Sequence, residues 1–346
     1  MENNSLKLNI LYQFNNKYAP YAGVSIFSLL INNRHFDELN IYIFDDSQDP
    51  ISQENQHKLR KMVSQFHRNI TVLNTDKLID IMKEVGIPPY RGSYSTNMKM
   101  FYSYLIPDSC DRLLYIDSDT IIDGKLDYFS ILDFQNNYQA MVLDSVGQMH
   151  KFDIGLTEND NYFNAGVILF NTSLWKQDKC IEKIINHAKN VRAHYPAPDQ
   201  DLLNIVLNKR ILAIDPRYNF QPIHMVYTAE IYKNNYRMSN YYSIKELEEA
   251  KNNVIIYHCF RYLGEFPWHL NNLHPCSPIF DMYLKKSPWH NYIKKPASTG
   301  LIIKLEKLLY RLLPRKVFIK IFKICHRKFL ISANKQSLKN KNDKKM

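Results

Sequence analysis

Short apolar runs alternate with longer amphipathic segments through the first third of the sequence. These runs, together with two later ones, predict strands at residues 8–12, 41–44, 70–73, 113–116, 140–143 and 166–170. Segments with helical spacing predict helices at residues 21–31, 51–68, 96–106, 174–192 and 199–207. This order is typical of βαβ units, in which mostly parallel strands form a sheet that helices cover. The sequence therefore predicts an α/β fold.

The net charge of +11 is concentrated at the C-terminal end of the chain. Residues 301–346 contain 14 Lys and Arg residues and two acids, so this tail carries +12 and residues 1–300 carry −1. A protein that binds along nucleic acid needs a basic face on its folded body. The nearly neutral body therefore argues against nucleic acid as a partner.

The five cysteines are widely spaced, without the Cys-x-x-Cys pair that would suggest a zinc or redox site. We therefore expect reduced, structural thiols. The first eight residues lack the charged-then-apolar order of a signal peptide, and no apolar run of about 18 residues precedes residue 300. These features predict a cytoplasmic protein.

Two acids flank a single residue directly after the predicted strand 113–116. Asp117 and Asp119 can direct both carboxylates to one point at the edge of the sheet, where open α/β sheets bind ligands. Two hard oxygen ligands suit Mg²⁺ or Mn²⁺, and a diphosphate would complete the coordination shell. The alternative is a surface turn, in which Asp is common. The position after a buried strand favours the metal site.

Five short blocks follow one another along the chain: DRLLYIDSD at 111–119, YFNAGV at 162–167, PDQDLLN at 198–204, RYNF at 217–220, and His258 followed by PWH at 267–269. In this order they resemble the retaining glycosyltransferases of family 8, which include bacterial lipooligosaccharide galactosyltransferases and the glycogenins. The resemblance covers residues 8–292. It implies a GT-A catalytic domain over residues 1–295, with a Rossmann-like mixed sheet that binds a nucleotide sugar.

The resemblance makes His258 the third protein ligand of a divalent metal that Asp117 and Asp119 also hold. An imidazole beside two carboxylates is compatible with Mn²⁺, and Mg²⁺ is the alternative. From the residues alone, a single His at the end of the apolar run 254–257 is more often a structural residue.

The resemblance also assigns residues to the donor sugar. Asn164 and Ala165 would contact the sugar and the acceptor. Asp199 would bind sugar hydroxyls, with Asp144 as a second sugar-binding acid, and Gln200 would lie near the anomeric carbon. The residues alone allow simpler roles, which are a turn before a strand for Asn164 and a helix cap for Asp199.

Retention of the anomeric configuration usually indicates a carboxylate nucleophile beside the glycosidic bond. The resemblance places Gln200 on that face, and a neutral amide is a poor nucleophile. We therefore expect a front-face mechanism, in which the metal and nearby cations stabilise the departing nucleoside diphosphate while an oxocarbenium-like sugar forms. The acceptor hydroxyl then enters on the same side, and Gln200 stabilises charge through its carbonyl dipole.

Two loops around the expected nucleotide depart from the family pattern. In the family a Lys before Pro-Trp pairs with the diphosphate, whereas here Phe266 takes its place in a segment that is two residues longer. Arg261 could supply the missing charge, because guanidinium binds phosphate well. Gly264 belongs to the same expected diphosphate loop.

The second departure is the N-terminal loop, which lacks the acids common in the family. Here Asn16 could hydrogen-bond uracil or ribose, and Tyr18 could stack on the base. Lys99 stands where an Arg that contacts the donor is common, which keeps the charge but loses the bidentate fork. Ser118, between the two metal-binding acids, completes the expected nucleotide-sugar site.

The tail has helical spacing of apolar and basic residues up to Leu330, interrupted at Pro314. We expect residues 296–346 to form a basic amphipathic extension, whose segment 301–330 lies on an anionic membrane surface and whose end is disordered. The alternative is a helix that packs on the catalytic body and keeps one solvated face.

These features predict a divalent-metal-dependent hexosyltransferase that moves galactose or glucose from a UDP-sugar to a lipid-linked glycan. Lipopolysaccharide or capsule assembly at the inner face of the cell membrane would be the setting. One alternative is a non-catalytic protein of the same fold that binds nucleotide sugar or glycan. Another is a phosphotransferase or nucleotidyltransferase that uses the same Asp pair, and the downstream sugar blocks argue against it.

Overall fold

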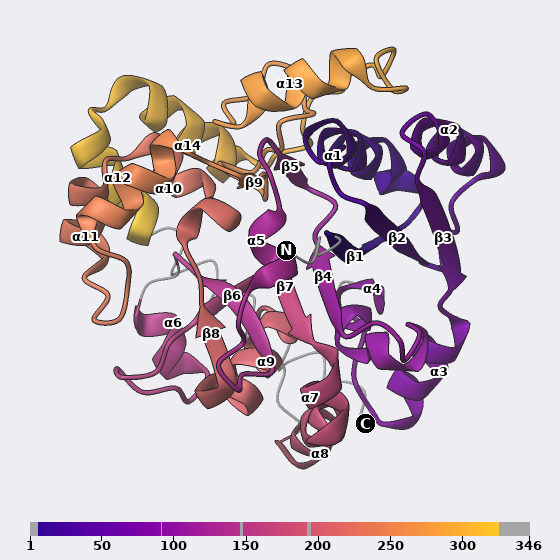
Figure 1. The fold of residues 1–346 in the computed structure, drawn as a ribbon. Coiled ribbons are helices and arrows are strands. Elements are labelled where there is room, and N and C mark those ends of the chain that lie inside the picture. The colour runs from indigo at the N-terminus through magenta and orange to yellow at the C-terminus, as the bar shows by residue number, and fades with distance from the viewer. Residues whose placement is uncertain (1–5, 91, 146–147, 192–194, 325–346) are drawn as a thin grey trace, which may run out of the picture.

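A seven-stranded sheet in the order β3-β2-β1-β4-β7-β6-β8 runs through the centre of the protein (Figure 1). The structure is a computed structural model that describes residues 6–90, 92–145, 148–191 and 195–324. The strands are Lys7–Phe14 (β1), Glu38–Asp45 (β2), Asn69–Asn74 (β3), Arg112–Ile116 (β4), Gln139–Leu143 (β6), Phe163–Asn171 (β7) and Ile211–Ala213 (β8). Strands β3, β2, β1 and β4 are parallel, whereas β7 is antiparallel to both β4 and β6. The sheet is therefore mixed, and the predicted α/β fold is confirmed.

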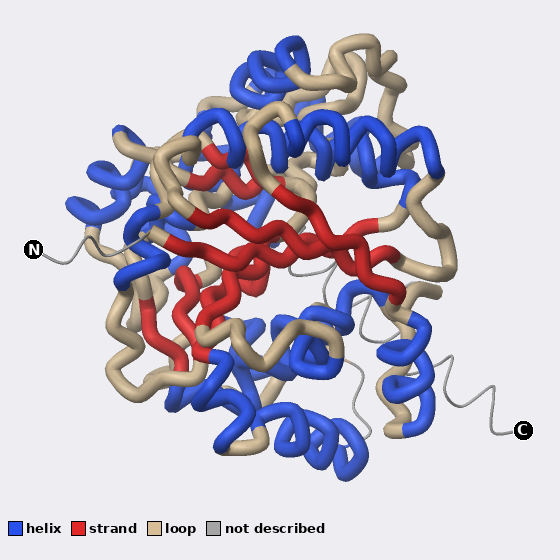
Figure 2. Tube along the Cα trace, turned by 45° about the vertical axis from the view of Figure 1, so that its right-hand side comes forward, coloured by secondary structure: helices blue, strands red, loops and turns tan. Residues whose placement is uncertain are grey.

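Helices lie above and below the sheet, so that the fold has three layers (Figure 2). One face carries α1 (Ala19–Asn32), α2 (Gln53–Ser64) and α13 (Ser277–Lys286), and the opposite face carries α3 (Asp76–Glu84), α7 (Thr172–Gln177), α8 (Cys180–Val191) and α9 (Pro198–Leu207) (Figure 1). The remaining α-helices are Ser95–Met98 (α4), Asp127–Ile131 (α5), Gln148–Asp153 (α6), Pro222–Val226 (α10), Ala229–Tyr236 (α11), Ile244–Asn252 (α12) and Leu301–Leu312 (α14). Central strands covered on both faces need apolar side chains on both, and every residue of β6 is buried.

A second, two-stranded antiparallel sheet joins β5 (Thr120–Ile122) to β9 (Ile256–His258). Thr120 pairs with His258 in its register. The backbone N–H of Cys259 also donates to the carbonyl oxygen of Asp119 over 2.6 Å. This small sheet therefore places His258 beside the Asp117–Asp119 loop, although the two lie far apart in the sequence.

Two predicted helices differ from the structure. Residues 96–106 form the short α4 followed by a 3₁₀-helix at Lys99–Tyr104, in which the four successive residues from Lys99 to Tyr102 are buried. The single helix predicted at 174–192 is wrong. Lys179 adopts a left-handed backbone with φ 50°, which ends α7 before α8 begins. Residue 192 lies outside the described residues.

Helix α14 and a following helix at 315–324 pack along the body of the protein. Phe318 and Ile319 are fully buried, and the ring of Tyr310 meets the ring of Tyr262 edge to face at 6.0 Å. Within the described part of the chain, every helix is too short or too polar to span a bilayer. The predicted continuation to residue 330 and the predicted disordered end fall beyond residue 324, outside the described residues. The predicted domain boundary at residue 296 stays a prediction.

Candidate active site

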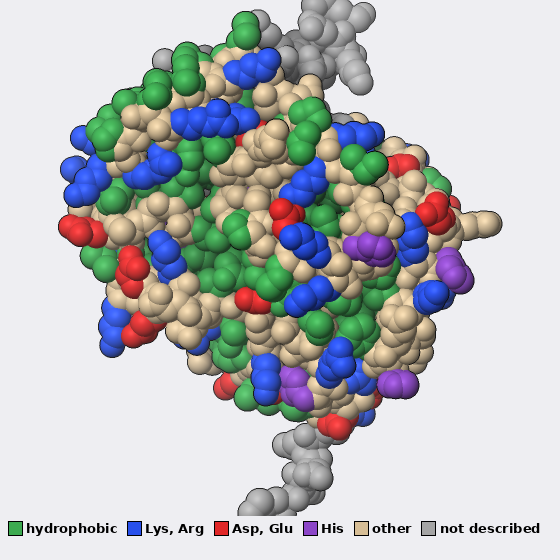
Figure 3. Space-filling model, turned by 90° about the horizontal axis from the view of Figure 1, so that it is seen from above, with side chains coloured by type: hydrophobic (Ala, Val, Ile, Leu, Met, Phe, Trp, Pro, Cys, Tyr) green, Lys and Arg blue, Asp and Glu red, His purple; other side chains and the backbone are tan. Residues whose placement is uncertain are grey.

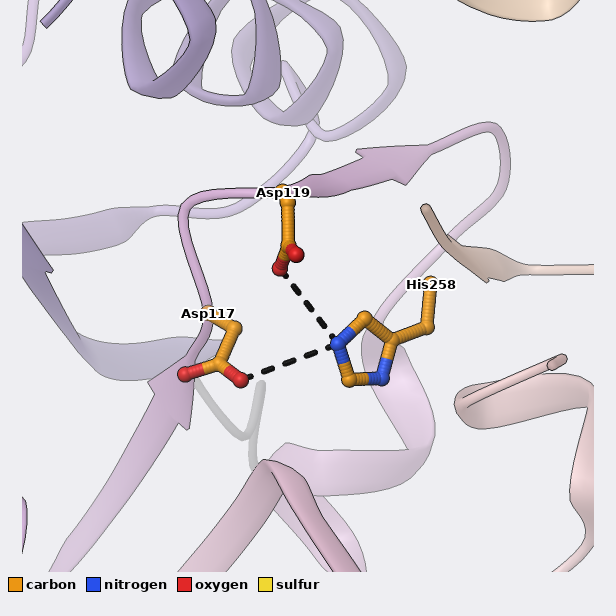
Figure 4. Close-up of side chains that lie close together, drawn as sticks. All are labelled: Asp117, Asp119 and His258. Atoms are coloured by element: carbon orange, nitrogen blue, oxygen red, sulfur yellow. Dashed lines mark ion pairs between the residues drawn. The ribbon is translucent and has the colours of Figure 1, made fainter. Parts of the chain in front are cut away.

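Asp117, Asp119 and His258 converge at the carboxyl end of β4 (Figure 4). The Nε2 atom of His258 lies 3.3 Å from Oδ1 of Asp119 and 3.6 Å from Oδ2 of Asp117. One potential ligand atom from each residue lies within 4.8 Å of those from the other two. Two carboxylates and one imidazole are a donor set that fits Mn²⁺ or Mg²⁺, so these three residues can hold a divalent cation.

The hydrogen bonds of His258 fix which ring nitrogen faces the acids. Its Nδ1 atom lies 2.9 Å from Oδ1 of Asn219 and 3.1 Å from Oδ1 of Asn164. The Asn164 atom must be an acceptor, because the backbone N–H of Gly166 donates to it over 3.0 Å. Nδ1 of His258 is therefore the protonated nitrogen, and in the neutral ring Nε2 presents its lone pair to the carboxylates. Hydrogen bonds of this kind orient metal-binding histidines in general.

Gly166 provides the space that the His258 ring occupies. A Cβ atom built on Gly166 would lie 2.0 Å from Cε1 and 2.5 Å from Nδ1 of His258. Both distances are far below van der Waals contact, so no other residue fits here while the ring stays in place. The Asn-Ala-Gly sequence lies within β7, so the predicted turn before this strand is wrong, and its glycine makes room for His258.

The buried ammonium group of Lys99 links two acids of the site. Its Nζ atom lies 2.8 Å from Oδ2 of Asp199 and 3.2 Å from Oδ1 of Asp117. It also donates to the carbonyl oxygen of Ala165 and lies 4.3 Å from the ring centroid of Tyr115. Burial opposes its charge, but Asp117 and Asp199 outweigh this cost and raise the pKa of Lys99 well above its ordinary value.

Burial also governs the ionisation of the three potential metal ligands. It raises the pKa of Asp117, to which the charge of Asp119 adds. It opposes ionisation of Asp119 too, but the hydrogen bond and charge of His258 prevail, and the pKa of Asp119 is lowered. For His258, burial opposes the charged ring while Asp119 and Asp117 favour it, and its pKa is raised.

Asp144, Asn164 and Gln200 form a second cluster next to Asp117, Asp119 and His258. Oδ2 of Asp144 accepts hydrogen bonds from Nδ2 of Asn164 at 2.7 Å and from Nε2 of Gln200 at 3.2 Å. Oε1 of Gln200 accepts the backbone N–H of Ala165 at 3.0 Å. The amide of Gln200 is thereby held in one orientation, with its nitrogen toward the acid. The sequence-predicted sugar residues are thus brought together around one point.

The residues predicted around the nucleoside have contacts within the protein. Oδ1 of Asn16 accepts hydrogen bonds from the backbone N–H of Ser52 and from Nδ2 of Asn55. Tyr18 meets the ring of Trp268 edge to face at 6.2 Å. Ser118 is buried, and its hydroxyl donates to the carbonyl oxygen of Gln13. The Ser118 contact ties the end of β1 to the loop that carries Asp117 and Asp119.

The predicted diphosphate loop is folded as an aromatic stack. The ring of Phe266 stacks on Trp268 at 4.5 Å, and the guanidinium of Arg261 lies 5.2 Å from the Phe266 centroid. Gly264 lies in a tight turn with φ 74°, where a Cβ atom would come within 2.6 Å of Ile303 in α14. The structure therefore places Gly264 against the tail helix, whereas Arg261 remains exposed and forms no ion pair with any described residue.

Sequence reasoning gave no role to several residues that build the site. Asn219 lay within a recognised block, but nothing local indicated that it would orient His258. Gly166 lay within another, and only the position of the ring explains why it is glycine. Tyr115, whose hydroxyl donates to Oδ1 of Asp117, sits inside an apolar strand and looked like an ordinary core residue.

Residues 9–271 match the model of the family described as glycosyl transferase family 8. The chain is 28% identical to the lipopolysaccharide 1,2-glucosyltransferase of Escherichia coli K12, over 92% of this chain and 88% of that protein. It is also 28% identical to the lipopolysaccharide 1,3-galactosyltransferase of Salmonella typhimurium LT2, over 85% of this chain and 82% of the relative.

A solved structure shares the fold. The galactosyltransferase LgtC, crystallised with donor and acceptor sugar analogs, superposes with a TM-score of 0.65 at 20% sequence identity. The match covers 81% of this chain and 96% of that one. The family match extends over most of the chain and includes Asp117, Asp119 and His258. The protein is a glycosyltransferase and belongs to glycosyl transferase family 8.

Proposed function

We propose that this enzyme transfers galactose or glucose from a UDP-sugar to a lipid-linked glycan, with retention of configuration and with a divalent cation at Asp117, Asp119 and His258. One observation carries the proposal. Lys99 joins the potential metal ligand Asp117 to Asp199, which supports one continuous site for the metal and the sugar. The relatives named as lipopolysaccharide glucosyl- and galactosyltransferases support a glycolipid acceptor in lipopolysaccharide assembly.

When bound, the cation would supply Lewis acidity that offsets the charge of the departing diphosphate. Asp117 and Asp119 would hold it with carboxylate oxygens, and His258 with Nε2. The remaining residues of the site arrange the donor. Manganese and magnesium both suit this donor set, and manganese is the preferred choice because of the imidazole ligand.

Neither acid near the sugar is arranged as a free nucleophile. One oxygen of Asp144 accepts two amide hydrogen bonds, and Asp199 is paired with Lys99 at 2.8 Å. Both carboxylates would bind and orient sugar hydroxyls. The amide nitrogen of Gln200 points toward Asp144. This arrangement supports front-face transfer, in which the acceptor oxygen enters on the side that the diphosphate leaves.

A donor screen tests the proposed activity. Purified enzyme with Mn²⁺ is incubated with several UDP-sugars, and release of UDP is measured against the double variant Asp117→Asn/Asp119→Asn. We expect release from UDP-galactose or UDP-glucose that the variant lacks. Binding of a UDP-sugar without release would instead support a non-catalytic binding protein. A trapped glycosyl adduct on Asp144 or Asp199 would overturn the front-face mechanism.

We also propose that the tail region binds an anionic membrane surface, which would place the enzyme at the inner face of the cell membrane. Leu301, Ile302 and Leu312 are 83%, 78% and 70% exposed although they are large and apolar. Basic residues are also exposed on α14 and on the helix at 315–324, at Lys304, Arg311, Lys316, Lys320 and Lys323. Hydrophobic and basic side chains lie together over this part of the surface (Figure 3). Each basic residue near an anionic surface adds about 1 kcal/mol of attraction.

The membrane test needs point substitutions, because deletion of the tail would uncover the core around Phe318. In the triple variant Leu301→Ser/Ile302→Ser/Leu312→Ser, we expect binding to vesicles with anionic lipid to fall while UDP release in solution is kept. A matched control replaces the equally exposed Ile131 on α5 with Ser. Equal vesicle binding by wild type and triple variant would contradict this part of the proposal.

A further inference from the structure

Behind Gln200 lies a buried group of three polar side chains that the proposed chemistry does not use. His150 in α6, Asp201 in α9 and Tyr162 before β7 are all buried. Nε2 of His150 lies 3.0 Å from Oδ1 of Asp201 and 3.1 Å from the Tyr162 hydroxyl. The Tyr162 hydroxyl in turn donates to the same Asp201 oxygen over 2.5 Å.

This group is anchored to the start of the helix that carries Gln200. The second oxygen of Asp201 accepts the backbone N–H of Ala197 at 2.9 Å, and the N–H of Asp201 donates to the Ala197 carbonyl. The Asp201 carboxylate is therefore held on both of its oxygens. Its fixed carboxylate serves as the acceptor that holds both His150 and Tyr162.

The link to the proposed reaction runs through the Tyr162 hydroxyl. Because that hydroxyl gives its proton to Asp201, its oxygen is free to accept, and Nε2 of Gln200 donates to it at 3.0 Å. The second proton of the same amide nitrogen goes to Asp144 at 3.2 Å. Asp201, which as a carboxylate only accepts, thus determines the direction of the hydrogen bonds that run from it through Tyr162 to Gln200.

We propose that His150 is a positioning residue, which acts through Asp201 and Tyr162 to hold the Gln200 amide in its orientation during the proposed sugar transfer. If His150 is replaced, Asp201 and the Tyr162 hydroxyl lose the ring nitrogen that contacts both, and the hydroxyl that Gln200 contacts is held less firmly. The electrostatics agree with this role. Burial opposes a charged imidazole, but Asp201 outweighs it and raises the pKa of His150, with Asp144 and Asp153 adding to the effect.

The inference rests on the proposed function, so its test begins with wild-type turnover of a UDP-sugar. His150→Phe removes the hydrogen bond, and we expect kcat to fall about tenfold while the KM for the donor changes less than about twofold. His150→Gln, whose Nε2 can take the place of the imidazole Nε2, should recover most of kcat. His187→Phe is the matched control and should leave kcat unchanged, because among the described residues the His187 ring hydrogen-bonds the Tyr195 hydroxyl and none of His150, Asp201 and Tyr162.

A double-mutant comparison separates positioning from general damage to the fold. In a Gln200→Ala background, His150→Phe should cost less than about twofold in kcat, since its partner in catalysis is already gone. Tyr162→Phe interrupts the same series of hydrogen bonds at another point and should lower kcat as His150→Phe does. If His150→Phe does not fold, the kcat of Tyr162→Phe tests the inference. An unchanged kcat in both His150→Phe and Tyr162→Phe would overturn the inference. So would a decrease in kcat on adding His150→Phe to Gln200→Ala that is as large as in the wild-type background. Absence of wild-type turnover would instead overturn the proposed function.

Discussion

The imidazole of His258 occupies the volume in which a side chain at position 166 would begin. An added Cβ atom at Gly166 would lie 2.0 Å from Cε1 of His258, so the ring and any side chain exclude each other. The ring cannot retreat easily, because Nδ1 is held by Asn164 and Asn219. Gly166 is therefore as necessary to the proposed metal site as the ligands themselves.

Replacing Gly166 with Ala should displace His258 and weaken metal binding. We expect the Kd for Mn²⁺ to rise by about 10- to 100-fold, the range found when the support of a metal-binding histidine is lost. Isothermal titration calorimetry measures the change. Gly300→Ala is the matched control, because a Cβ atom there meets nothing within 4 Å. If Gly166→Ala binds Mn²⁺ like wild type, His258 does not hold the metal in this position.

Asn219 should matter through the tautomer of His258. Asn219→Leu removes the acceptor at 2.9 Å from Nδ1, which leaves Asn164 as the remaining acceptor and lets the ring tilt. We expect the Mn²⁺ Kd to rise by about tenfold, with a smaller effect than that of His258→Ala. An unchanged Kd in Asn219→Leu, with His258→Ala strongly impaired, would show that Asn164 alone orients the ring.

Lys99 should oppose metal binding while it supports the sugar site. Its ammonium lies 3.2 Å from a carboxylate oxygen of Asp117, so a cation at that acid is repelled by it. In Lys99→Met we expect the Mn²⁺ Kd to fall by about tenfold, equivalent to about 1.4 kcal/mol. Turnover should fall at the same time, because Asp199 loses its buried partner.

The control for this prediction is Lys99→Arg, which keeps the charge and should leave the Mn²⁺ Kd within about twofold of wild type. Weaker Mn²⁺ binding in Lys99→Met would contradict the repulsion and would indicate that Lys99 organises the metal site. Thermal unfolding of both variants with and without Mn²⁺ provides a second reading of the affinity.

How far the site can be predicted from the sequence depends on whether its contacts are local. Asp117 and Asp119 follow an apolar strand, and that pattern alone indicates a ligand site at the sheet edge. The pairing of β5 with β9, which brings His258 to these acids, joins distant segments, and only the family resemblance suggested it. The space for His258 at Gly166 depends on a ring from the other half of the chain, so no local pattern shows it.

In the fold too, features with a local sequence pattern were predicted and features without one were not. The parallel strands β1 to β4 and the helices α1 and α2 were predicted because each has its own periodicity, whereas α3 was not predicted. The antiparallel insertion of β7 leaves no mark in its apolar sequence, because an apolar strand buried on both faces reads alike in either direction. The break between α7 and α8 rests on a left-handed Lys179, a conformation that the sequence around it does not require.

His224 should make the stability of the protein depend on pH. Burial lowers the pKa of His224 to about 3. The unfolded chain takes up this proton near the ordinary value of 6.5, so between these values the unfolded state binds more protons than the folded state, and stability falls as the pH falls. This one group contributes a slope of up to about 1.4 kcal/mol per pH unit in that window.

Urea unfolding between pH 7 and pH 4 measures this slope. In His224→Leu the dependence on pH should be shallower than in wild type by that amount, whatever the change in absolute stability. His57 is exposed on α2, and His57→Gln should keep the wild-type slope. A slope that is the same in His224→Leu and wild type would show that His224 is not held neutral in the folded protein.

The metal dependence of UDP release tests the central claim most directly. The initial rate is measured at rising Mn²⁺ concentration after chelation of the wild type and of His258→Asn. The proposed site predicts no release without metal, saturation in the wild type, and a half-saturating Mn²⁺ concentration at least about tenfold higher in the variant. Release by the chelated wild type, or identical Mn²⁺ curves for the two proteins, would contradict a catalytic cation held by Asp117, Asp119 and His258.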